Sequence, residues 1–246
     1  MQVVATVSVK GGVGKTATVV NLATEATRDG ARVLVWDLDP QGSATYLLRA
    51  EHRLPGGAKR LAGPAGELAP HVRATVVPGL HVVPADLSLR FLDRHLDAVD
   101  RPRRRLGTLL AALADDYDLA VLDCPPGASL AVESAIRASD LLLTPVVPTT
   151  LAMLTLAQLE EVVAQRGRAP RLLAHVSMLD RRKRLQRDTT EELLARDDVL
   201  RTIIPSASAV ERMGPERAPV RLFAPRSRAA AAYRELWHEL RGSVWN

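Results

Sequence analysis

The segment SVKGGVGKTAT, residues 8–18, combines two lysines with three glycines and a following threonine. The compact ammonium group of a lysine fits between phosphate oxygens where the wider planar fork of an arginine does not. The chain has four lysines, Lys10, Lys15, Lys59 and Lys183, and otherwise uses arginine for its fixed positive charges. Two of the four lie in this short segment, which makes it a candidate phosphate site.

The residues around this segment predict a strand, a glycine turn and a helix. Residues 2–8 form a β-branched run, and residues 16–28 have a helical pattern that leads to a glycine. Free N–H groups at the start of a helix, together with the helix dipole, attract an anion. We expect Lys15 to reach the β- and γ-phosphates of a nucleotide and the Thr16 hydroxyl to bind Mg²⁺. This is a P-loop, although Val9 stands where the strict pattern G-x-x-x-x-G-K-[ST] has its first glycine.

Two acidic segments follow other predicted strands. DLDPQGSAT begins at Asp37 after the apolar run RVLVW, and DCPPG begins at Asp123 after LAVL. The carboxyl ends of parallel strands meet at one edge of a sheet, where ligands bind. Carboxylates at that edge can orient an attacking water or hold Mg²⁺ through water. We expect Asp123 to accept from Mg²⁺-bound water or from the Thr16 hydroxyl.

The signature KGGVGKT resembles the deviant Walker A motif of the ParA/MinD family of ATPases, and DLDPQGSAT is similar to the D-x-D-P-Q-G-[NS]-A-T segment of ParA proteins. The resemblance runs from Val3 to about Leu240. It implies an ATP-sandwiched dimer in which Lys10 reaches the phosphates of the partner subunit. It also implies that Asp39 carries the hydrolysis role, that Asp37 supports it, and that ATP and Mg²⁺ are the cofactors.

The motifs and the resemblance together give a set of candidate site residues. The catalytic candidates are Lys10, Lys15, Asp39 and Asp123. The nucleotide-binding candidates are Lys10, Gly11, Gly12, Val13, Gly14, Lys15, Thr16, Ala17, Met178, Asp180 and Pro205, of which the last three are placed near the adenine by resemblance. Thr16 would bind the metal directly, and Asp39 and Asp123 would bind it through water.

Alternating strand and helix patterns predict an α/β fold: a doubly wound, mostly parallel sheet with helices on both faces. The predicted strands are residues 2–8, 32–36, 80–83, 119–122, 141–144, 171–178 and 200–204. The predicted helices are residues 16–28, 87–96, 102–113, 130–137, 151–165, 189–196 and 228–240. Residues 53–70, rich in Gly, Pro and Ala, are expected to be a surface loop. We expect one domain, residues 1–246, without an N-terminal helix-turn-helix.

Composition narrows the choice of relative. The chain has 246 residues, no apolar run approaching ~20 residues and no basic region at its start, so we expect neither a membrane span nor a signal peptide. Its single cysteine, Cys124, cannot supply the ligands of a shared iron–sulfur cluster, nor the cysteines of arsenite-pump ATPases. We interpret it as a packing residue in a cytoplasmic protein. Dethiobiotin and cobyrinate synthetases share the fold, but DLDPQGSAT fits them poorly.

Positive charge is concentrated toward the C-terminus, where residues 166–228 hold 15 lysines and arginines against 8 acidic residues. A basic surface suits non-specific binding to double-stranded DNA, as the resemblance implies. The candidates are Arg181, Arg182, Lys183, Arg184, Arg187, Arg212 and Arg217. ParA proteins usually follow the I-P pair with R-N-x-[RK], whereas this chain reads IPSASA. We therefore hypothesise that DNA binding has moved to these arginines; a solvated Arg-rich face is the alternative.

Two other functions stay open. A septum-positioning, MinD-like ATPase would use a C-terminal amphipathic helix on a membrane, and Tyr233, Leu236, Trp237 and Leu240 form an apolar stripe; we expect this helix to dock on the sheet instead. A nucleotide-switched scaffold with negligible turnover is the second alternative. We favour a nucleoid-associated partition ATPase with slow hydrolysis, stimulated by a ParB-like partner.

Overall fold

An eight-stranded sheet runs through the computed structural model, which describes residues 1–63, 65–164 and 170–245. The strands are β1 Gln2–Thr6, β2 Val33–Asp37, β3 Arg73–Ala74, β4 Leu80–Val83, β5 Leu119–Asp123, β6 Leu141–Val146, β7 Arg171–Leu179 and β8 Val199–Pro205. Their order across the sheet is β3-β4-β2-β5-β1-β6-β7-β8, and every pairing is parallel except that of β3 with β4. The predicted doubly wound α/β fold is confirmed.

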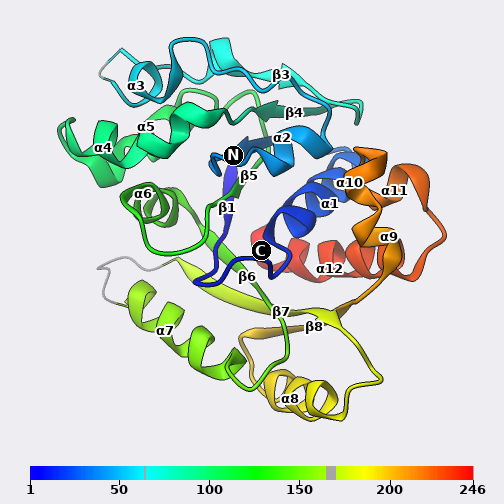
Figure 1. Ribbon diagram of the computed structural model, residues 1–246. Coiled ribbons are helices and arrows are strands. Elements are labelled where there is room, and N and C mark those ends of the chain that lie inside the picture. The colour runs from blue at the N-terminus through cyan, green and yellow to red at the C-terminus, as the bar shows by residue number, and fades with distance from the viewer. Residues whose placement is uncertain (64, 165–169, 246) are drawn as a thin grey trace.

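Helices cover both faces of this sheet (Figure 1). One face carries α1 Lys15–Arg28, α2 Ser43–Leu47, α9 Ser208–Glu211, α10 Met213–Glu216, α11 Val220–Phe223 and α12 Arg228–Val244. The other face carries α3 Gly57–Ala62, α4 Leu92–Asp97, α5 Arg105–Ala111, α6 Leu130–Ala138, α7 Ala152–Ala164 and α8 Arg184–Leu194. Three 3₁₀ turns, Ala69–His71, Leu87–Phe91 and Pro102–Arg104, complete the described elements.

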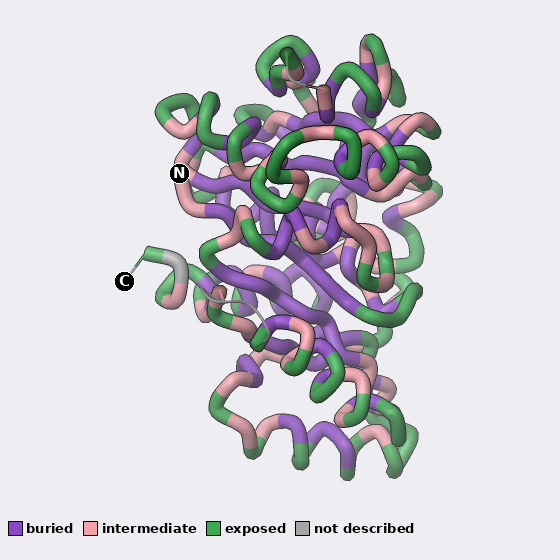
Figure 2. Tube along the Cα trace, turned by 90° about the vertical axis from the view of Figure 1, so that its left-hand side faces the viewer, coloured by how far each residue is buried: buried purple, intermediate pink, exposed green. Residues whose placement is uncertain are grey.

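The apolar runs of the sequence become strands that are buried on both sides. All residues of β2 and β5 are buried, and Figure 2 shows buried backbone running through the middle of the molecule. Parallel strands covered by helices need such continuous apolar sequence, because neither face meets water. The carboxyl ends of β1, β5 and β2 lie in register, with Thr6 beside Asp123 and Asp123 beside Asp37.

The C-terminal helix docks on the sheet, as expected. Tyr233, Leu236, Trp237 and Leu240 are each at most 2% exposed and belong to the core between α12 and the sheet. The stripe that suggested membrane contact is thus part of the interior. Among the described residues, no helix has the length and apolarity needed to cross a bilayer.

The prediction that residues 53–70 form a surface loop is wrong. Helix α3 forms within this segment, and Leu54, Leu61 and Leu68 are each at most 3% exposed. The guanidinium of Arg105 donates to the backbone oxygens of Leu61, Gly63 and Gly66 and so anchors the chain after the helix. Burial of spaced leucines outweighs the Gly and Ala content that suggested a loop; Pro64 lies outside the described residues.

Other element boundaries also differ from the predictions. Helix α8 begins at Arg184, not near residue 189, so two candidate DNA-binding residues, Arg184 and Arg187, lie on its first turns. Residues 87–91 and 102–104 are 3₁₀ turns that precede α4 and α5. The short helices α9–α11 were not predicted, because four-residue helices give no periodic signal. The predicted end of the 151–165 helix, Gln165, lies outside the described residues.

A buried carboxylate joins α1 to the C-terminal helices. The Glu25 side chain is 1% exposed and pairs with Arg221 on α11 at 2.6 Å and with Arg234 on α12 at 3.4 Å. One turn further on, Asp29 accepts a 2.7 Å hydrogen bond from the Trp237 indole. A buried carboxylate is stable only when cations and donors surround it, so these pairs are required once Glu25 is enclosed.

We predict that Glu25→Gln lowers the free energy of unfolding by about 2–3 kcal/mol, because mostly buried Arg221 loses its anionic partner. Urea unfolding followed by circular dichroism measures the change. Glu235→Gln is the control, since Glu235 is exposed on α12 and has no ion pair within the described residues. Equal urea midpoints for Glu25→Gln and the unmodified chain would contradict the prediction.

Candidate functional site

The turn between β1 and α1 presents backbone N–H groups to a cleft. Gly12 and Gly14 have φ of 73° and 96°, in the left-handed region that favours glycine. Gly14 is the N-cap of α1, no side chain caps the helix, and its first turn has no acidic residue. The first N–H groups of the helix therefore lack partners inside it. A Cβ on Gly14 would also lie 2.9 Å from the Ser177 hydroxyl, which would have to shift to accommodate it.

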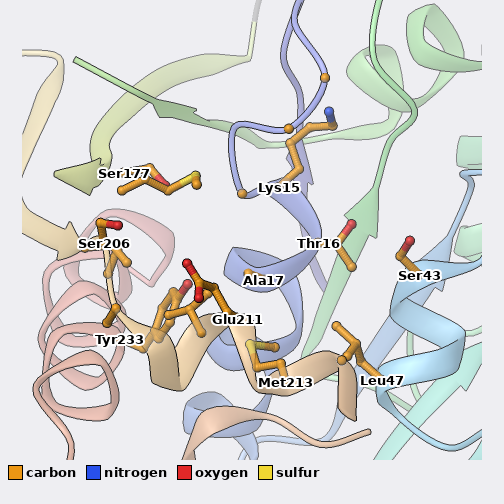
Figure 3. A pocket seen from close by; sticks show the side chains of 18 of the residues that line it. Lys15, Thr16, Ala17, Ser43, Leu47, Ser177, Ser206, Glu211, Met213 and Tyr233 are labelled. Carbon is orange, nitrogen blue, oxygen red and sulfur yellow. The ribbon is translucent and has the colours of Figure 1, made fainter. Parts of the chain in front are cut away.

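The cleft in front of this turn has a volume of about 420 Å³. Figure 3 shows side chains from α1, α2, β7, the end of β8, α9, α10 and α12 converging on it. The candidate residues that line it are Gly11, Gly12, Gly14, Lys15, Thr16, Ala17, Asp39, Met178 and Pro205. Residues from segments distant in sequence thus meet beside the N-terminus of α1.

Asp123 lies at the end of β5, next to the end of β1, and does not itself line the cleft. It is 1% exposed, and among the residues that the structure describes neither carboxylate oxygen has a hydrogen-bond partner in good geometry. Burial, and next the charge of Asp37, raise the pKa of Asp123 well above its ordinary value, while Thr16 and Lys15 oppose the rise. Such an unpartnered carboxylate fits the outer sphere of a hydrated Mg²⁺ held by the Thr16 hydroxyl. The residues present therefore suit that metal.

Asp37 and Asp39 have different surroundings despite their spacing. Asp37 is fully buried and accepts from the Thr45 amide at 2.8 Å, the Thr45 hydroxyl at 2.7 Å and the Asp39 amide at 3.2 Å. Burial nonetheless raises its pKa. Asp39 lines the cleft, and one of its oxygens accepts from the Gln41 amide at 2.9 Å. Asp37 holds the loop in shape, and Asp39 presents a carboxylate to the cleft.

The two lysines of the motif also lie in different places. Lys15 is 7% exposed and lines the cleft, and its ammonium makes no hydrogen bond or ion pair with the described residues. Burial lowers its pKa, and Asp123 and then Asp39 oppose that change. Lys10 is exposed and does not line the cleft; its amide donates to the Ser8 hydroxyl at 3.2 Å. Val13, another candidate, is buried behind the turn.

The far end of the cleft is formed by β7 and β8. Met178 adopts φ of 57° next to a register irregularity of β7 and lines the cleft together with Pro205. Asp180 does not line the cleft, contrary to the sequence prediction. Its carboxylate receives two 2.9 Å hydrogen bonds from Arg182, which hold the pKa of Asp180 at about 2, on the outer side of the strand end.

A buried histidine joins this far end to α1. His175 on β7 lies 3.3 Å from the Thr18 hydroxyl through Nε2. Burial lowers the pKa of His175 to about 4, so the ring is neutral at physiological pH. The contact ties the strand that carries Ser177 and Met178 to the helix that follows the phosphate turn.

Sequence reasoning missed part of the lining. The additional residues are Gln41, Ser43, Leu47, Ser177, Ile204, Ser206, Ala207, Val210, Glu211, Met213, Gly214 and Tyr233. Gln41 and Ser43 belong to the DLDPQGSAT segment and could have been found from it. The lining residues of α9 and α10 were not predicted, because we interpreted the uncharged IPSASA run at residues 204–209 only as a difference from ParA proteins.

The candidate DNA-binding residues fall into two places. Residues 181–187 lie between β7 and α8 or on its first turns, whereas Arg212 and Arg217 flank α10, well apart from α8 in Figure 1. Arg181, Arg182 and Arg228 line a second groove of about 670 Å³ between the strand ends and α12. Arg212 pairs with Glu216. The structure therefore separates one basic cluster from two arginines with local partners.

Comparison with known proteins places these features in a family. Residues 1–170 match the family described as AAA domain. The sporulation initiation inhibitor protein Soj of Bacillus subtilis is 33% identical, over 97% of this chain and 98% of that protein. The chromosome-partitioning ATPase Soj of Thermus thermophilus is 36% identical over 96% and 93% of the two chains, respectively. The chromosome partitioning protein ParA of Caulobacter vibrioides is 32% identical over 98% and 94%.

Solved structures agree on the fold. A cobyrinic acid a,c-diamide synthase from Mycobacterium smegmatis with bound ADP and magnesium has a TM-score of 0.82 and 27% identity, over 98% of this chain and 94% of that chain. A putative plasmid partition protein from Borrelia burgdorferi bound to AMPPNP has a TM-score of 0.88 over 99% of both chains; at 19% identity it shows the fold alone. Two of these near-full-length relatives, at 32% and 36% identity, have chromosome-partitioning names, and the third, at 33%, shares the name Soj with one of them. The chain therefore belongs to the ParA/Soj-type partition ATPases.

Proposed function

We propose that this partition ATPase binds Mg²⁺-ATP in the cleft, with the triphosphate at the start of α1 and the base toward Met178 and Pro205. The observation that supports this most is that unpaired helix N–H groups and Lys15 meet in one cleft, while the unpartnered carboxylate of Asp123 is buried next to Lys15 and Thr16. A relative of 27% identity has been solved with ADP and magnesium bound, which agrees with the proposal.

Each residue of the cleft has a role that its surroundings permit. The N–H groups of the turn and the Lys15 ammonium stabilise charge on the phosphoryl oxygens during transfer. Asp39 orients the attacking water, because its carboxylate faces the cleft while Asp37 holds the loop. Thr16 would hold Mg²⁺ directly and Asp123 through water; when bound, the metal neutralises phosphate charge.

The proposal extends to a dimer that forms around ATP. Lys10 is exposed and does not line its own cleft, so its ammonium is free to reach nucleotide bound to a second copy. The ATP-bound dimer would bind DNA without sequence preference, associate with the nucleoid and leave it after hydrolysis. A ParB-like partner would accelerate that hydrolysis.

The cluster at residues 181–187 is the better of the two candidate DNA surfaces. Arg181 and Lys183 are exposed and their side chains have no ion pair within the described residues. Arg182 is held by Asp180, and Arg184 has only a 3.7 Å pair with Asp188. Unpaired basic side chains are the ones that can neutralise phosphates and release counterions.

The septum-positioning alternative loses its main support in the structure. The apolar stripe of α12 that could have served as a membrane anchor is buried against the sheet. We therefore retain the partition function as the proposal.

We predict that Asp39→Ala reduces ATP hydrolysis by at least about 100-fold while nucleotide binding persists, because the variant loses the group that orients water. It should also prolong ATP-dependent retention on DNA in a gel shift. Phosphate release and gel shifts with ATP, ADP or no nucleotide measure both effects.

The control for that experiment is Lys15→Ala, which should abolish nucleotide binding and hence retention. Hydrolysis by Asp39→Ala at the rate of the unmodified protein would remove Asp39 from the proposed mechanism.

We predict that reversing the charge of Arg181 and Lys183 together to Glu weakens ATP-dependent DNA binding by at least about tenfold and makes it less sensitive to salt. Nucleotide binding should be unchanged, because neither residue lines the cleft. Fluorescence anisotropy of a labelled duplex at two salt concentrations measures the effect.

Arg212→Glu provides the comparison, since this arginine already pairs with Glu216 and lies away from the cluster. Unchanged DNA affinity in the double reversal, or an equal loss in Arg212→Glu, would rule out residues 181–187 as the principal DNA surface.

A further inference from the structure

An arginine at the end of α2 is hydrogen-bonded to the end of α10. The Arg49 guanidinium donates from Nε to the Arg217 carbonyl and from Nη2 to the Glu216 carbonyl, both at 2.9 Å. These carbonyls belong to the C-terminal end of a helix, where backbone oxygens lack partners within the helix and attract a cation. One side chain thereby joins segments 168 residues apart.

A second contact joins the same two segments in the opposite direction. The Arg217 guanidinium lies 4.5 Å from the centre of the Tyr46 ring on α2. A guanidinium over an aromatic face is attracted to it. Arg49 reaches from α2 to α10 and Arg217 reaches back, so the two arginines and Tyr46 form a reciprocal clasp.

Both arginines occupy a backbone conformation that disfavours a side chain. Arg49 has φ of 55° and Arg217 has φ of 46°, two of the four positive-φ residues other than glycine in the described chain. Such conformations persist where surrounding contacts hold them, and they often mark functional positions. The clasp is therefore maintained against a local conformational cost at both of its ends.

The clasp lies at the rim of the nucleotide cleft. Ser43 and Leu47 of α2 line one wall, and Glu211, Met213 and Gly214 of α9 and α10 line the wall beside it. Figure 3 shows Leu47 and Met213 facing each other across the lower end of the cleft. Arg49 and Arg217 follow these two walls in sequence and join them outside the cleft.

We propose that Arg49, Arg217 and Tyr46 form a clasp that holds the α9–α10 wall against α2 and sets how long nucleotide stays bound. The three are positioning residues, because none of them lines the cleft. This inference rests on the proposed function, in which the cleft binds nucleotide. It also reassigns Arg217, a candidate DNA-binding residue, to the cleft rim.

Glycine variants separate the clasp from general stability. Glycine adopts φ near +50° readily, so Arg49→Gly and Arg217→Gly remove side-chain contacts and also relieve backbone strain. We expect each variant to keep or raise the urea midpoint of nucleotide-free protein. We expect Arg49→Gly to release a fluorescent ADP analogue at least about tenfold faster in stopped-flow displacement, because it loses two hydrogen bonds from a charged group. We expect Arg217→Gly to release it about two- to fivefold faster, because this variant keeps the backbone carbonyl that accepts from Arg49 and loses only the contact with the Tyr46 ring.

Arg53→Ala is the matched control, because Arg53 is an exposed arginine four residues further on, with no side-chain hydrogen bond or ion pair in the described chain. Its release rate should equal that of the unmodified protein. Arg49→Lys should fall between the unmodified protein and Arg49→Gly, since a single ammonium reaches the carbonyls without the fork that binds both.

Two outcomes would overturn the proposal. Release by Arg49→Gly at the rate of Arg53→Ala would show that the clasp does not hold nucleotide. Faster release accompanied by a lower urea midpoint, with a loss of unfolding free energy as large as the change calculated from the release rates, would show that the clasp only contributes to general stability. Failure of the unmodified protein itself to bind the ADP analogue would instead refute the proposed function, and the clasp's role with it.

Discussion

The site depends on one constraint: the turn at residues 7–14 must lead from a buried parallel strand into α1 and leave the first N–H groups of the helix unpaired. The left-handed conformation of Gly14 makes that turn possible, and no side chain caps the helix. The resulting concentration of partial positive charge faces the edge of the sheet where β1, β5 and β2 end. An anion at this point is stabilised by backbone alone, before any side chain contributes.

The same edge of the sheet gathers acidic groups that would repel a phosphate without a cation. Asp37, Asp39 and Asp123 all lie there, and the buried pair Asp37 and Asp123 occupy adjacent register positions. Hydrogen bonds from the Thr45 amide and hydroxyl stabilise the negative charge of Asp37, whereas the Asp123 carboxylate accepts no hydrogen bond of good geometry from the described residues. Lys15 offsets part of this charge, and a hydrated Mg²⁺ would supply the rest. The combination explains why one site needs both a cationic turn and acidic strand ends.

Much of this arrangement could be predicted from the sequence, because it rests on local signals. The glycine turn, Lys15 and the carboxylates after apolar strands each have a pattern within a few residues, and the alternation of strands and helices predicts the sheet. The predictions that were wrong concern segments whose structure depends on tertiary contacts. Leu54 and Leu61 are buried by helices far along the chain, so residues 53–70 showed no clear period.

The far end of the cleft shows the same limit. Asp180 was placed near the adenine with Met178 by resemblance to ParA proteins, but only Met178 lines the cleft, next to the irregular register of β7, while Asp180 pairs with Arg182. The clasp between Arg49 and Arg217 lay equally beyond prediction, since two exposed arginines have no sequence signal that pairs them. Local sequence patterns thus predict the residues at the phosphate-binding end of the cleft, whereas packing between distant segments determines the residues at its far end.

The most direct test of the account is a calorimetric titration of the unmodified protein with a non-hydrolysable ATP analogue, with and without Mg²⁺. We expect one analogue bound per chain, with higher affinity when Mg²⁺ is present. Asp123→Asn should lose that gain, because a neutral amide replaces the carboxylate that receives the metal's water. Binding that is absent, or that is indifferent to Mg²⁺ in the unmodified protein, would contradict the central claim that α1, Thr16 and Asp123 form a single metal–nucleotide site.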